Sequence, residues 1–580
     1  MDIVLSVDGK SANTNAPLKD TENLNAIRAG GFVGFINDIE YVSKSHVMID
    51  RLKMAGTVSV KKTDVNNSTD SVYLGGLVGE CQGRGTIQNV NVSGAVKMDV
   101  LNNSGAMYIN YICGGVIGKM RDGHLLNCGF AGRIDLPGSY NVASTTYVGG
   151  LVGTIGFLLE GEFKDDEDNE WRLSEQIKEE VTIENCIISG DLNLNHAGLG
   201  KINIGGICAS AAGSFYSLKF LGSTYRHHSR EVIKFKNCEY RGNLIKFERK
   251  NTGLASQNIG GFIADMIGGI ELENCRSRTG LIEINVNANA DDNSFNVGGF
   301  AGLLRGDLDF CYSNSVIDIN FNGSGNLNAG GFFGNRQGNI IYPESFRDDC
   351  LISRSYSAGS ITITAGSSDI VTVNAGGFIG NVQSVLADYY DIDDNYAQVD
   401  ILVNRSGSGS GRINAGGFAG FNAGRIYRCF ATGNVTVHSN EETTVYVGGI
   451  TGYNNNILLQ SVALNKYITL FGGDADDSRI GRLDSITGGR FAIESMVLAE
   501  GAYGSLTTTI PDTRKGFDGD TVTDSAVKLQ HFWTADGGSG AGAGFTADIW
   551  NFAGIASRGY PLLRTGGNVV KGNMSWQVVR

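Results

Sequence analysis

The stretch Ala415-Gly416-Gly417-Phe418-Ala419-Gly420 is one copy of a pattern that recurs along about four fifths of the chain. The pattern reads apolar-Gly-Gly-apolar-x-Gly/Ala, and successive copies lie 32 to 56 residues apart. The Gly-Gly pairs of its eleven copies begin at Gly30, Gly75, Gly114, Gly149, Gly205, Gly260, Gly298, Gly330, Gly376, Gly416 and Gly448. A repeat with variable spacing is typical of a solenoid, because each coil contacts only its neighbours and tolerates loop insertions.

Each unit continues with the signal apolar-x-x-Cys-x-x-x-Gly, as in Ile426, Cys429 and Gly433, followed by a short alternating run such as residues 434–438. β-Branched residues at period two indicate strands. We expect about three short strands in each unit, separated by glycine or polar turns. Such units stack as an all-β, right-handed parallel β-helix of about eleven irregular coils, with long loop insertions and a C-terminal capping segment.

Two rows of residues mark a bend inside the units. Asparagine occupies one position in five consecutive units, at Asn89, Asn127, Asn185, Asn237 and Asn274. Because asparagine tolerates the left-handed conformation, we expect a turn there with a ladder of stacked amides. The next row holds Cys128, Cys186, Cys238, Cys275, Cys311 and Cys429, with Ser355, Asn395 and Ser461 as replacements. This spacing lacks the paired geometry of a zinc site, so we expect buried, stacked thiols and few or no disulfides.

Composition excludes several classes of protein. Glycine accounts for 83 of 580 residues and proline for only 5, which argues against a linker or collagen-like chain. The net charge of −13 opposes nucleic acid or an anionic membrane as the main partner. No apolar run approaches the ~18 residues of a membrane helix, so we expect no direct membrane insertion.

The first residues are expected to begin within a repeat. Ile3–Val7 has the pattern of a strand that would end a preceding coil, and Met1–Val4 lacks a secretory signal. We expect that a signal has been removed. Residues 1–465 are assigned to the repeats, with insertions near 157–180, 213–232 and 341–350, and residues 466–580 to the final coils and an aromatic cap.

Three insertions are candidate binding sites. The segment 215–228 is aromatic and basic, a composition enriched at recognition surfaces but equally typical of a loop folded back onto the helix. Its candidate ligand-binding residues are Tyr216, Phe220, Tyr225, Arg226 and His228. The acidic segment 165–171, inside the best helical candidate at 164–180, lacks the ligand spacing of a calcium loop. The segment 388–394 combines two tyrosines with aspartates and fits either sugar stacking or a turn.

Acidic residues form a further candidate site on the outer surface. Alignment of the units places Glu184, Lys236, Glu273 and Asp309 in one outward row, with Lys234, Glu271 and Asp307 two residues upstream. Glu271, Glu273, Asp307 and Asp309 would then form a carboxylate patch across two coils. Paired carboxylates can cleave a glycosidic bond or bind Ca²⁺. A solvated sheet face with charges that oppose aggregation is the alternative interpretation.

The aromatic residues near the C-terminus predict the cap. Phe532, Trp533, Phe545 and Trp550, followed by Tyr560-Pro561-Leu562-Leu563, gather in a short span. A β-helix has an open end that invites edge pairing and has to be covered. We expect this segment to plug the last coil.

The repeat resembles the GLUG motif family, named for Gly-Leu-any-Gly. Residues 76–79 and 150–153 match the motif literally, while the other copies carry Phe, Ile or Val in place of Leu. The resemblance implies a bacterial surface or secreted protein, similar to adhesin-like proteins and to the repeat region of immunoglobulin-A1 proteases. It carries over no catalytic residue. The seven histidines never form the His-Glu-x-x-His motif that the protease relatives need.

The function expected from these observations is an extracellular, adhesin-like β-helical stalk on the bacterial surface, non-catalytic, which projects binding loops or adjacent domains. Its partners would be a host or matrix protein, a glycan, or neighbouring copies of the same assembly. No cofactor is expected, apart from Ca²⁺ as an open alternative. A polysaccharide lyase or hydrolase on the same architecture, or a subunit of a surface filament, remain the competing hypotheses.

Overall fold

The computed structural model describes twenty-four segments of the chain. They are residues 3–7, 26–38, 47–62, 71–83, 85–100, 110–136, 145–156, 181–196, 200–212, 215–220, 223–228, 233–249, 256–267, 270–287, 294–304, 306–337, 352–366, 371–383, 391–473, 479–481, 490–493, 497–500, 520–535 and 542–564. The expected helix at 164–180, the acidic segment 165–171 and the insertion 341–350 lie outside these segments.

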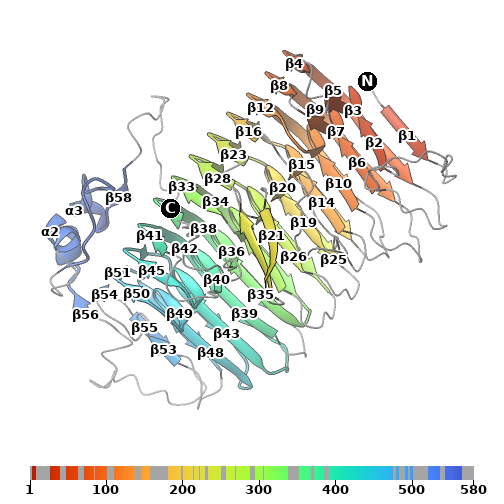
Figure 1. Cartoon of the computed structure of the whole chain (residues 1–580). Coiled ribbons are helices and arrows are strands. Elements are labelled where there is room, and N and C mark those ends of the chain that lie inside the picture. Colours follow the sequence, from red (N-terminus) through yellow and green to blue (C-terminus); the bar gives the residue numbers. More distant parts are fainter. Residues whose placement is uncertain are drawn as a thin grey trace.

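The described residues form the predicted parallel β-helix, whose coils stack along one axis from β1 to β56 (Figure 1). Every strand pair within the helix is parallel and joins one coil to the next, as in β39 and β43. The chain visits four sheets in each coil, in an order that we number 1 to 4. The expectation of about three strands per unit was wrong, because a third strand of two to four residues precedes the bend at the asparagine row.

Sheets 1 and 2 lie on either side of the Gly-Gly pair. Sheet 1 contains β2(Ala26–Gly30), β6(Ser71–Gly75), β10(Asn110–Gly114), β14(Thr145–Gly149), β19(Ile202–Gly205), β26(Gln257–Gly260), β31(Ser294–Gly298), β35(Gly325–Gly330), β39(Val371–Gly376), β43(Gly411–Gly416), β48(Thr443–Gly448) and β53(Arg479–Gly481). Sheet 2 contains β3(Val33–Asp38), β7(Val78–Gly83), β11(Ile117–Met120), β15(Val152–Gly156), β20(Cys208–Ala212), β27(Ile263–Ile267), β32(Ala301–Leu304), β36(Phe333–Gln337), β40(Ile379–Gln383), β44(Ala419–Asn422) and β49(Thr451–Asn454).

Sheets 3 and 4 complete the coil. Sheet 3 contains β4(Met48–Asp50), β8(Thr86–Gln88), β12(His124–Leu126), β16(Val181–Glu184), β23(Ile233–Lys236), β28(Ile270–Glu273), β33(Asp307–Asp309), β37(Ile352–Ser353), β41(Asp391–Asp393), β45(Arg425–Tyr427) and β50(Leu458–Leu459). Sheet 4 contains β1(Ile3–Val7), β5(Lys53–Lys62), β9(Asn91–Val100), β13(Gly129–Leu136), β17(Ile187–Ile188), β18(Asp191–His196), β24(Glu239–Tyr240), β25(Leu244–Arg249), β29(Arg276–Ser277), β30(Leu281–Val286), β34(Tyr312–Phe321), β38(Tyr356–Ala365), β42(Tyr396–Arg405), β46(Phe430–Ala431), β47(Val435–His438), β51(Ser461–Ala463), β52(Tyr467–Phe471), β54(Arg490–Ile493), β55(Val497–Glu500) and β56(Asp520–Val522).

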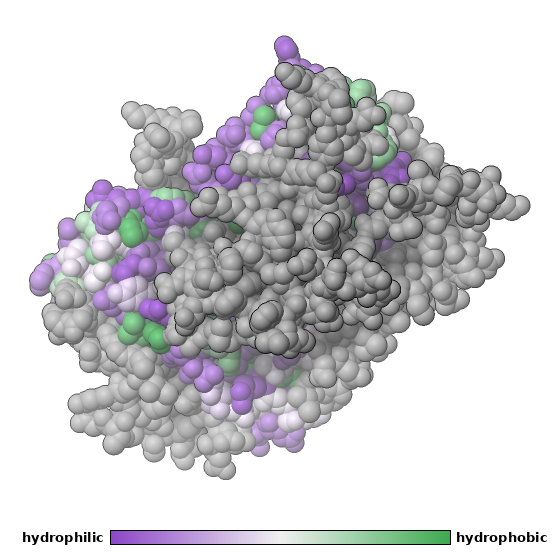
Figure 2. Space-filling view, in the orientation of Figure 1, coloured by the Kyte–Doolittle hydropathy of each residue, from purple (hydrophilic) through white to green (hydrophobic). Residues whose placement is uncertain are grey.

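The interior is a continuous apolar core made of side chains in register from coil to coil. The residue after the Gly-Gly pair is buried in every copy except the first, where Phe32 is exposed, and five phenylalanines at this position stack with ring centroids 4.7–4.9 Å apart. They are Phe262, Phe300, Phe332, Phe378 and Phe418. In the view of Figure 2 the described surface residues are mostly hydrophilic, with isolated hydrophobic ones among them. Burial of the repeated apolar residue therefore drives coil stacking.

The turn between sheets 3 and 4 confirms the predicted asparagine ladder. All five asparagines have φ between 52° and 56°. Three of the four neighbouring pairs are linked by amide-to-amide bonds, as in the 2.7 Å bond from Asn274 Nδ2 to Asn237 Oδ1. The same left-handed position continues beyond the asparagines as Phe310, Arg354, Asp394, Arg428 and Gln460. The turn conformation is thus a property of the coil, and after glycine, asparagine is among the residues that adopt it most readily.

The cysteine row is buried, as predicted, and its thiols are free. Each thiol also donates to backbone oxygens: Cys275 Sγ lies 3.4 Å from the carbonyl oxygen of Phe235, in the preceding coil, and 3.5 Å from that of Glu273. Asn395 Nδ2 donates to the equivalent pair of carbonyl oxygens at 2.8 Å. Serine makes the within-coil bond, at Ser355 and Ser461. The row therefore selects a small donor, which explains why Ser and Asn replace Cys.

The insertions leave the helix at two of its four junctions. One group follows sheet 2 and includes residues 157–180, 213–232 and 338–351. The other precedes sheet 1 and includes residues 101–109, 137–144 and 288–293. In contrast, the Gly-Gly corner between sheets 1 and 2 and the bend between sheets 3 and 4 take no insertion in the eleven copies. Loop variation is therefore confined to the two sides of the sheet 1–sheet 2 unit.

The C-terminal aromatic segment packs on the flank of the helix, and this differs from the expected plug in the last coil. Its elements are η2(Ala526–Lys528), α2(Gln530–Thr534), β57(Trp550–Asn551), α3(Ile555–Arg558) and β58(Leu562–Leu563), which lie beside sheets 3 and 4 in Figure 1. Trp533 and Trp550 lie with ring centroids 5.7 Å from that of Phe430. Phe430 ends an outward stack that continues through Tyr396 and Tyr356. This outward aromatic stack offers the segment an apolar surface on the side of the coils.

Candidate functional site

The carboxylate row lies on sheet 3 in the predicted register, with Glu271 paired to Asp307 and Glu273 to Asp309 along neighbouring strands. Cations from adjacent coils accompany these carboxylates. Lys236 Nζ lies 3.0 Å from Glu273 and Lys234 Nζ 3.8 Å from Glu271. The hydrogen bond that Lys236 donates to Glu273 raises the pKa of Lys236.

Asp309 is also paired. Arg354 Nε donates to its Oδ1 at 2.7 Å, and Ser353 Oγ donates to the same oxygen at 2.9 Å. Among the described residues, no group of three or more His, Cys, Asp or Glu side chains is arranged to hold a metal ion. The arrangement of Glu271, Glu273 and Asp309 is that of a charge ladder on a sheet face, in which each acid has a basic neighbour.

The aromatic and basic insertion forms an antiparallel hairpin of β21(Phe215–Phe220) and β22(Ser223–His228). Its register sets Tyr216 opposite His227 and Leu218 opposite Tyr225. The five candidate residues of this insertion therefore lie on one hairpin, a more regular element than the loop that the sequence suggested. Their ligand stays a prediction.

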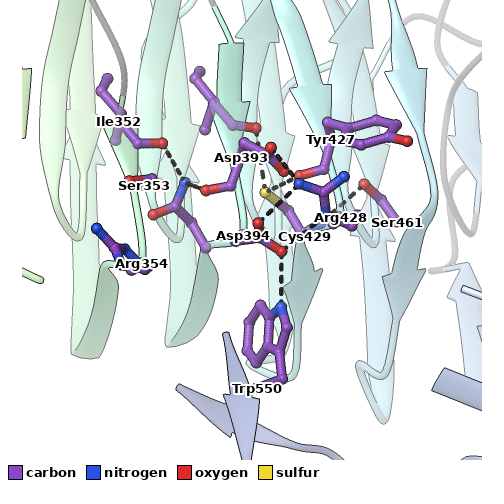
Figure 3. A network of polar contacts seen from close by, with 12 residues as sticks. Ile352, Ser353, Arg354, Asp393, Asp394, Tyr427, Arg428, Cys429, Ser461 and Trp550 are labelled. Atoms are coloured by element: carbon purple, nitrogen blue, oxygen red, sulfur yellow. Dashed lines mark hydrogen bonds and ion pairs between the residues drawn. The ribbon is translucent and has the colours of Figure 1, made fainter. Parts of the chain in front are cut away.

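Part of the predicted tyrosine and aspartate segment 388–394 anchors the C-terminal segment (Figure 3). Trp550 Nε1 donates to Asp394 Oδ1 at 2.7 Å, and Arg428 Nε donates to the same oxygen at 3.0 Å. Arg428 also pairs with Asp393. Burial disfavours the charge of Arg428, but the bond to Asp394 and the charges of both aspartates outweigh burial and raise its pKa. The network holds Trp550 against the turn, so these aspartates have a structural role. Tyr389 and Tyr390 lie outside the described residues.

The Gly-Gly corner is re-entrant, so that the outer faces of sheets 1 and 2 meet along the helix. The third glycine of the motif lies against the sheet 1 backbone of the preceding coil. A Cβ built on Gly302 would lie 2.7 Å from the backbone nitrogen of Ile259. The Gly-Gly pair itself allows the sharp reversal, because a Cβ on Gly376 would overlap the carbonyl oxygen of Ile379. We call the seam along which the two outer faces meet the crevice.

Side chains from both walls face each other in the crevice. At its N-terminal end Arg28 pairs with Glu80, and Lys119 Nζ lies 4.8 Å from the ring centroid of Tyr73. At its C-terminal end Tyr446 of sheet 1 and Tyr453 of sheet 2 lie 5.1 Å apart between ring centroids. The two outer faces are therefore close enough for side chains of opposite walls to make contact along the crevice.

The middle of the crevice is polar and buried. Sheet 1 contributes a second asparagine ladder in which each Nδ2 donates to the preceding Oδ1 at 2.7–3.0 Å. Its members are Asn203, Asn258, Asn296, Asn328, Asn374 and Asn414. Sheet 2 contributes Thr154, Ser210, Asp265, Asn335 and Asn381 from the facing row. Lys201 Nζ of sheet 1's edge reaches Asp265 Oδ2 at 2.8 Å.

Several of these buried groups have no hydrogen-bond partner within the part of the chain that the structure describes. They are Thr154 Oγ1, Asn203 Nδ2, Ser210 Oγ, Asp265 Oδ1, Asn335 Oδ1, Asn381 Oδ1 and Asn414 Oδ1. Each belongs to a residue that is at most 8% exposed. A buried polar atom without a partner costs about 1–3 kcal/mol. These seven atoms lie along one crevice.

Sequence reasoning missed the crevice, although its signal is visible. Asparagine stands two residues before the Gly-Gly pair in six successive units, from Asn203 to Asn414. A polar residue also follows the third glycine or alanine of the motif in most of those units, as at Ser210 and Asn335. The sequence does not reveal which way the corner bends, and a convex corner would have exposed both rows to solvent.

Comparison with known proteins yields one match. The GLUG motif matches residues 411–436, which contain β43 to the first residues of β47. No curated protein and no solved structure matches the chain. None of the described helices is long and apolar enough to cross a membrane.

The similarity to the repeat region of immunoglobulin-A1 proteases stays a prediction. The matched copy stacks in register with ten others that share its Gly-Gly corner. The GLUG repeat points to a protein of the bacterial surface type. The chain therefore carries a repeat of the GLUG type, with the motif itself matched at residues 411–436.

Proposed function

We propose that the chain is an extracellular, adhesin-like stalk of the bacterial surface, non-catalytic, that holds binding loops or adjacent domains away from the cell. The observation that carries this proposal is the distribution of insertions. The coils are uniform, and variable segments leave them at two junctions only. A rigid solenoid with variation along defined edges is the arrangement by which repeat proteins present a binding surface.

The surroundings of the carboxylates support binding rather than glycoside cleavage. An inverting or retaining glycosidase needs one carboxylic acid that stays protonated beside a second, ionised group. Glu273 has Lys236 at 3.0 Å and Asp309 has Arg354 as a bidentate partner. Both carboxylates are thus engaged with a basic side chain of a neighbouring coil, as in a charge ladder on a sheet face.

The expected partners are a host or matrix protein, a glycan, or neighbouring copies. The test is to expose the whole chain to arrays of glycans and matrix proteins, and in parallel to incubate it with polysaccharides while reducing ends and unsaturated products are measured. We expect binding to a restricted set of targets without turnover. Turnover of any polysaccharide would replace this proposal by the enzyme hypothesis, and absence of binding together with concentration-dependent assembly in light scattering would replace it by the filament hypothesis.

A further inference from the structure

We infer that an arginine patch on the outer face of sheet 4, formed by Arg241, Arg276 and Arg278, is a docking surface for an acidic segment of a protein partner. This inference rests on the proposed binding function and names the surface and the class of partner. Glu239 and Arg276 are paired rungs of β24 and β29, and Arg241 and Arg278 each follow two residues later in the same two coils. The residues between them are buried, so the three arginines lie together on the outer face.

The patch carries more positive charge than the chain around it neutralises. Glu239 is the one carboxylate at ion-pair distance among the described residues, 2.6 Å from Arg241 Nη2 and 3.3 Å from Arg278 Nε. Arg276 donates to Asn274 Oδ1 at 3.2 Å and has no carboxylate at ion-pair distance in the described part of the chain. Three guanidinium groups and one carboxylate leave a local charge of +2, whereas the whole chain has a net charge of −13. A local excess of this sign favours an acidic partner.

The guanidinium groups are held in place and remain accessible. The side chains of Arg241 and Arg278 are 49% and 43% exposed, while Glu239 between them is buried. Arg241 uses Nη2 to reach Glu239, and Arg278 uses Nε to donate to the hydroxyl of Tyr312 at 2.8 Å. Because a guanidinium group carries five N–H donors, most donors of each arginine are left for a carboxylate of a partner. Groups that are already positioned lose less conformational entropy on binding.

The neighbouring residues favour a protein over an anionic polysaccharide. Leu244, Leu281 and Val316 form a row of successive rungs beside the arginines, and Val316 is 44% exposed. On the other side Tyr312 and Tyr356 stack with ring centroids 5.2 Å apart. Arginine and tyrosine are enriched at the centres of protein interfaces, where apolar side chains are buried as well. A polysaccharide has no apolar side chains to place on the leucine and valine row.

The extent of the surface sets the length of the segment. Glu239 and Tyr356 are three coil steps apart, and each step of a parallel sheet is about 4.8 Å, so the surface extends over about 14 Å. About four residues of extended chain cover this distance. The C-terminal segment packs against Tyr356 and bounds the surface at that end. The expected ligand is therefore a short segment that combines carboxylates with apolar side chains.

The experiment measures binding of a fluorescently labelled octapeptide of alternating glutamate and leucine to the whole chain by anisotropy. The same peptide with glutamine in place of glutamate and a heparin hexasaccharide are the comparison probes. Arg276→Gln removes the arginine that has no carboxylate partner, and Glu239→Gln removes the carboxylate of the patch. Arg412→Gln is the matched control, because Arg412 is an exposed arginine of sheet 1 that lies 5.6 Å from the ring centroids of Tyr446 and Tyr453. Melting temperatures of all variants are measured in parallel.

We expect the glutamate peptide to bind more tightly than the other two probes, and Arg276→Gln to weaken it roughly fivefold or more. Glu239→Gln should strengthen binding, because it raises the local positive charge, and Arg412→Gln should leave it unchanged. Equal effects of Arg276→Gln and Arg412→Gln, or none in either, would overturn the assignment of the surface. Tighter binding of the heparin hexasaccharide would overturn the class of partner. Absence of binding to every probe would overturn this inference alone, since the arrays decide the proposed function independently.

Discussion

Two asparagine ladders run along the same rod, and they serve different purposes. The ladder at the bend between sheets 3 and 4 is exposed and has positive φ, so asparagine is favoured there by the backbone conformation. The ladder in the crevice lies in regular strands and is buried, so asparagine is favoured there by the hydrogen bonds that its amide makes to neighbouring side chains. Identical amide-to-amide bonds therefore indicate a turn in one place and a polar lining in the other.

The largest loss of stability is expected when the Gly-Gly corner between sheets 1 and 2 is altered. Gly376→Ala would push a Cβ into the carbonyl oxygen of Ile379, and we expect a loss of about 3 kcal/mol in unfolding free energy. Gly85→Ala is the matched control, because its Cβ would meet the nearest atom at 3.4 Å. Thermal and denaturant unfolding measure both variants. An equal, small effect in the two would contradict a steric role for the Gly-Gly pair.

Substitutions in each ladder distinguish the roles of the two asparagine rows. Asn328→Leu deprives Asn296 and Asn374 of their buried partners, and we expect a cost of about 2 kcal/mol. Asn237→Gly removes an exposed amide but suits the φ of 53°, so stability should change little, whereas Asn237→Ala should cost about 1 kcal/mol.

Glycine at the crevice position provides the control for this pair. Asn328→Gly should cost at least as much as Asn328→Leu, because the strand there needs no positive φ. Denaturant midpoints report all four variants. If glycine were tolerated in both ladders, asparagine would not be selected by backbone conformation in one ladder and by side-chain hydrogen bonds in the other.

At Asp394 the residue at the turn position has a further role, because it accepts the hydrogen bond that holds Trp550. Trp550→Phe keeps the aromatic ring and removes the donor to Asp394, and we expect a cost of about 2 kcal/mol, confined to the C-terminal segment. Hydrogen exchange should show faster exchange in residues 520–564 with unchanged protection in sheets 1 and 2. Trp533→Phe serves as a comparison, because Trp533 Nε1 donates within the segment, to the carbonyl oxygen of Val527. Uniform loss of protection along the rod would contradict a local clamp.

The cysteine row beside the turn tests whether this position requires a hydrogen-bond donor. Cys275→Ser should change stability by less than about 0.5 kcal/mol, while Cys275→Val, of similar size but without a donor, should cost about 1 kcal/mol. Burial raises the pKa of Cys429 in the same row well above its ordinary value, so Cys429 should resist alkylation in the folded chain at pH 8. Rapid labelling of Cys429 or greater tolerance of Val than of Ser would refute this view.

The smallest effect is expected on sheet 3. Glu273→Gln removes the partner of an exposed lysine and should cost no more than about 0.5 kcal/mol, vanishing in 1 M salt. The pKa of Lys236 is raised in the folded chain, so the contribution of the pair is complete below the ordinary lysine pKa and declines as the pH rises through the raised value. Stability measured between pH 9 and 12 should show this decline in the parent and not in the variant.

Much of the fold follows from the sequence because each coil repeats its chemistry in register. The Gly-Gly pattern predicts the β-helix, the asparagine row predicts the left-handed turn, and the cysteine row predicts buried free thiols. These features depend on residues that are close in the chain, where spacing and conformational preference are informative.

The missed features depend on contacts that the repeat does not encode. The strands of sheet 3 have only two to four residues, too few for a visible alternation, so the fourth strand was not recognised. The C-terminal aromatic residues contact Phe430 and Asp394 on the flank of the helix, more than 100 residues away in sequence, and do not cover the open end as predicted. The crevice depends on the direction in which the Gly-Gly corner bends, which the steric needs of glycine leave open.

The most direct test of the account is a crystal structure of the chain. The account predicts that the outer faces of sheets 1 and 2 meet at the Gly-Gly corner, with Asn296, Asn328 and Asn374 joined from Nδ2 to Oδ1 along the buried row. A corner that bends the other way and leaves this asparagine row exposed to solvent would contradict it.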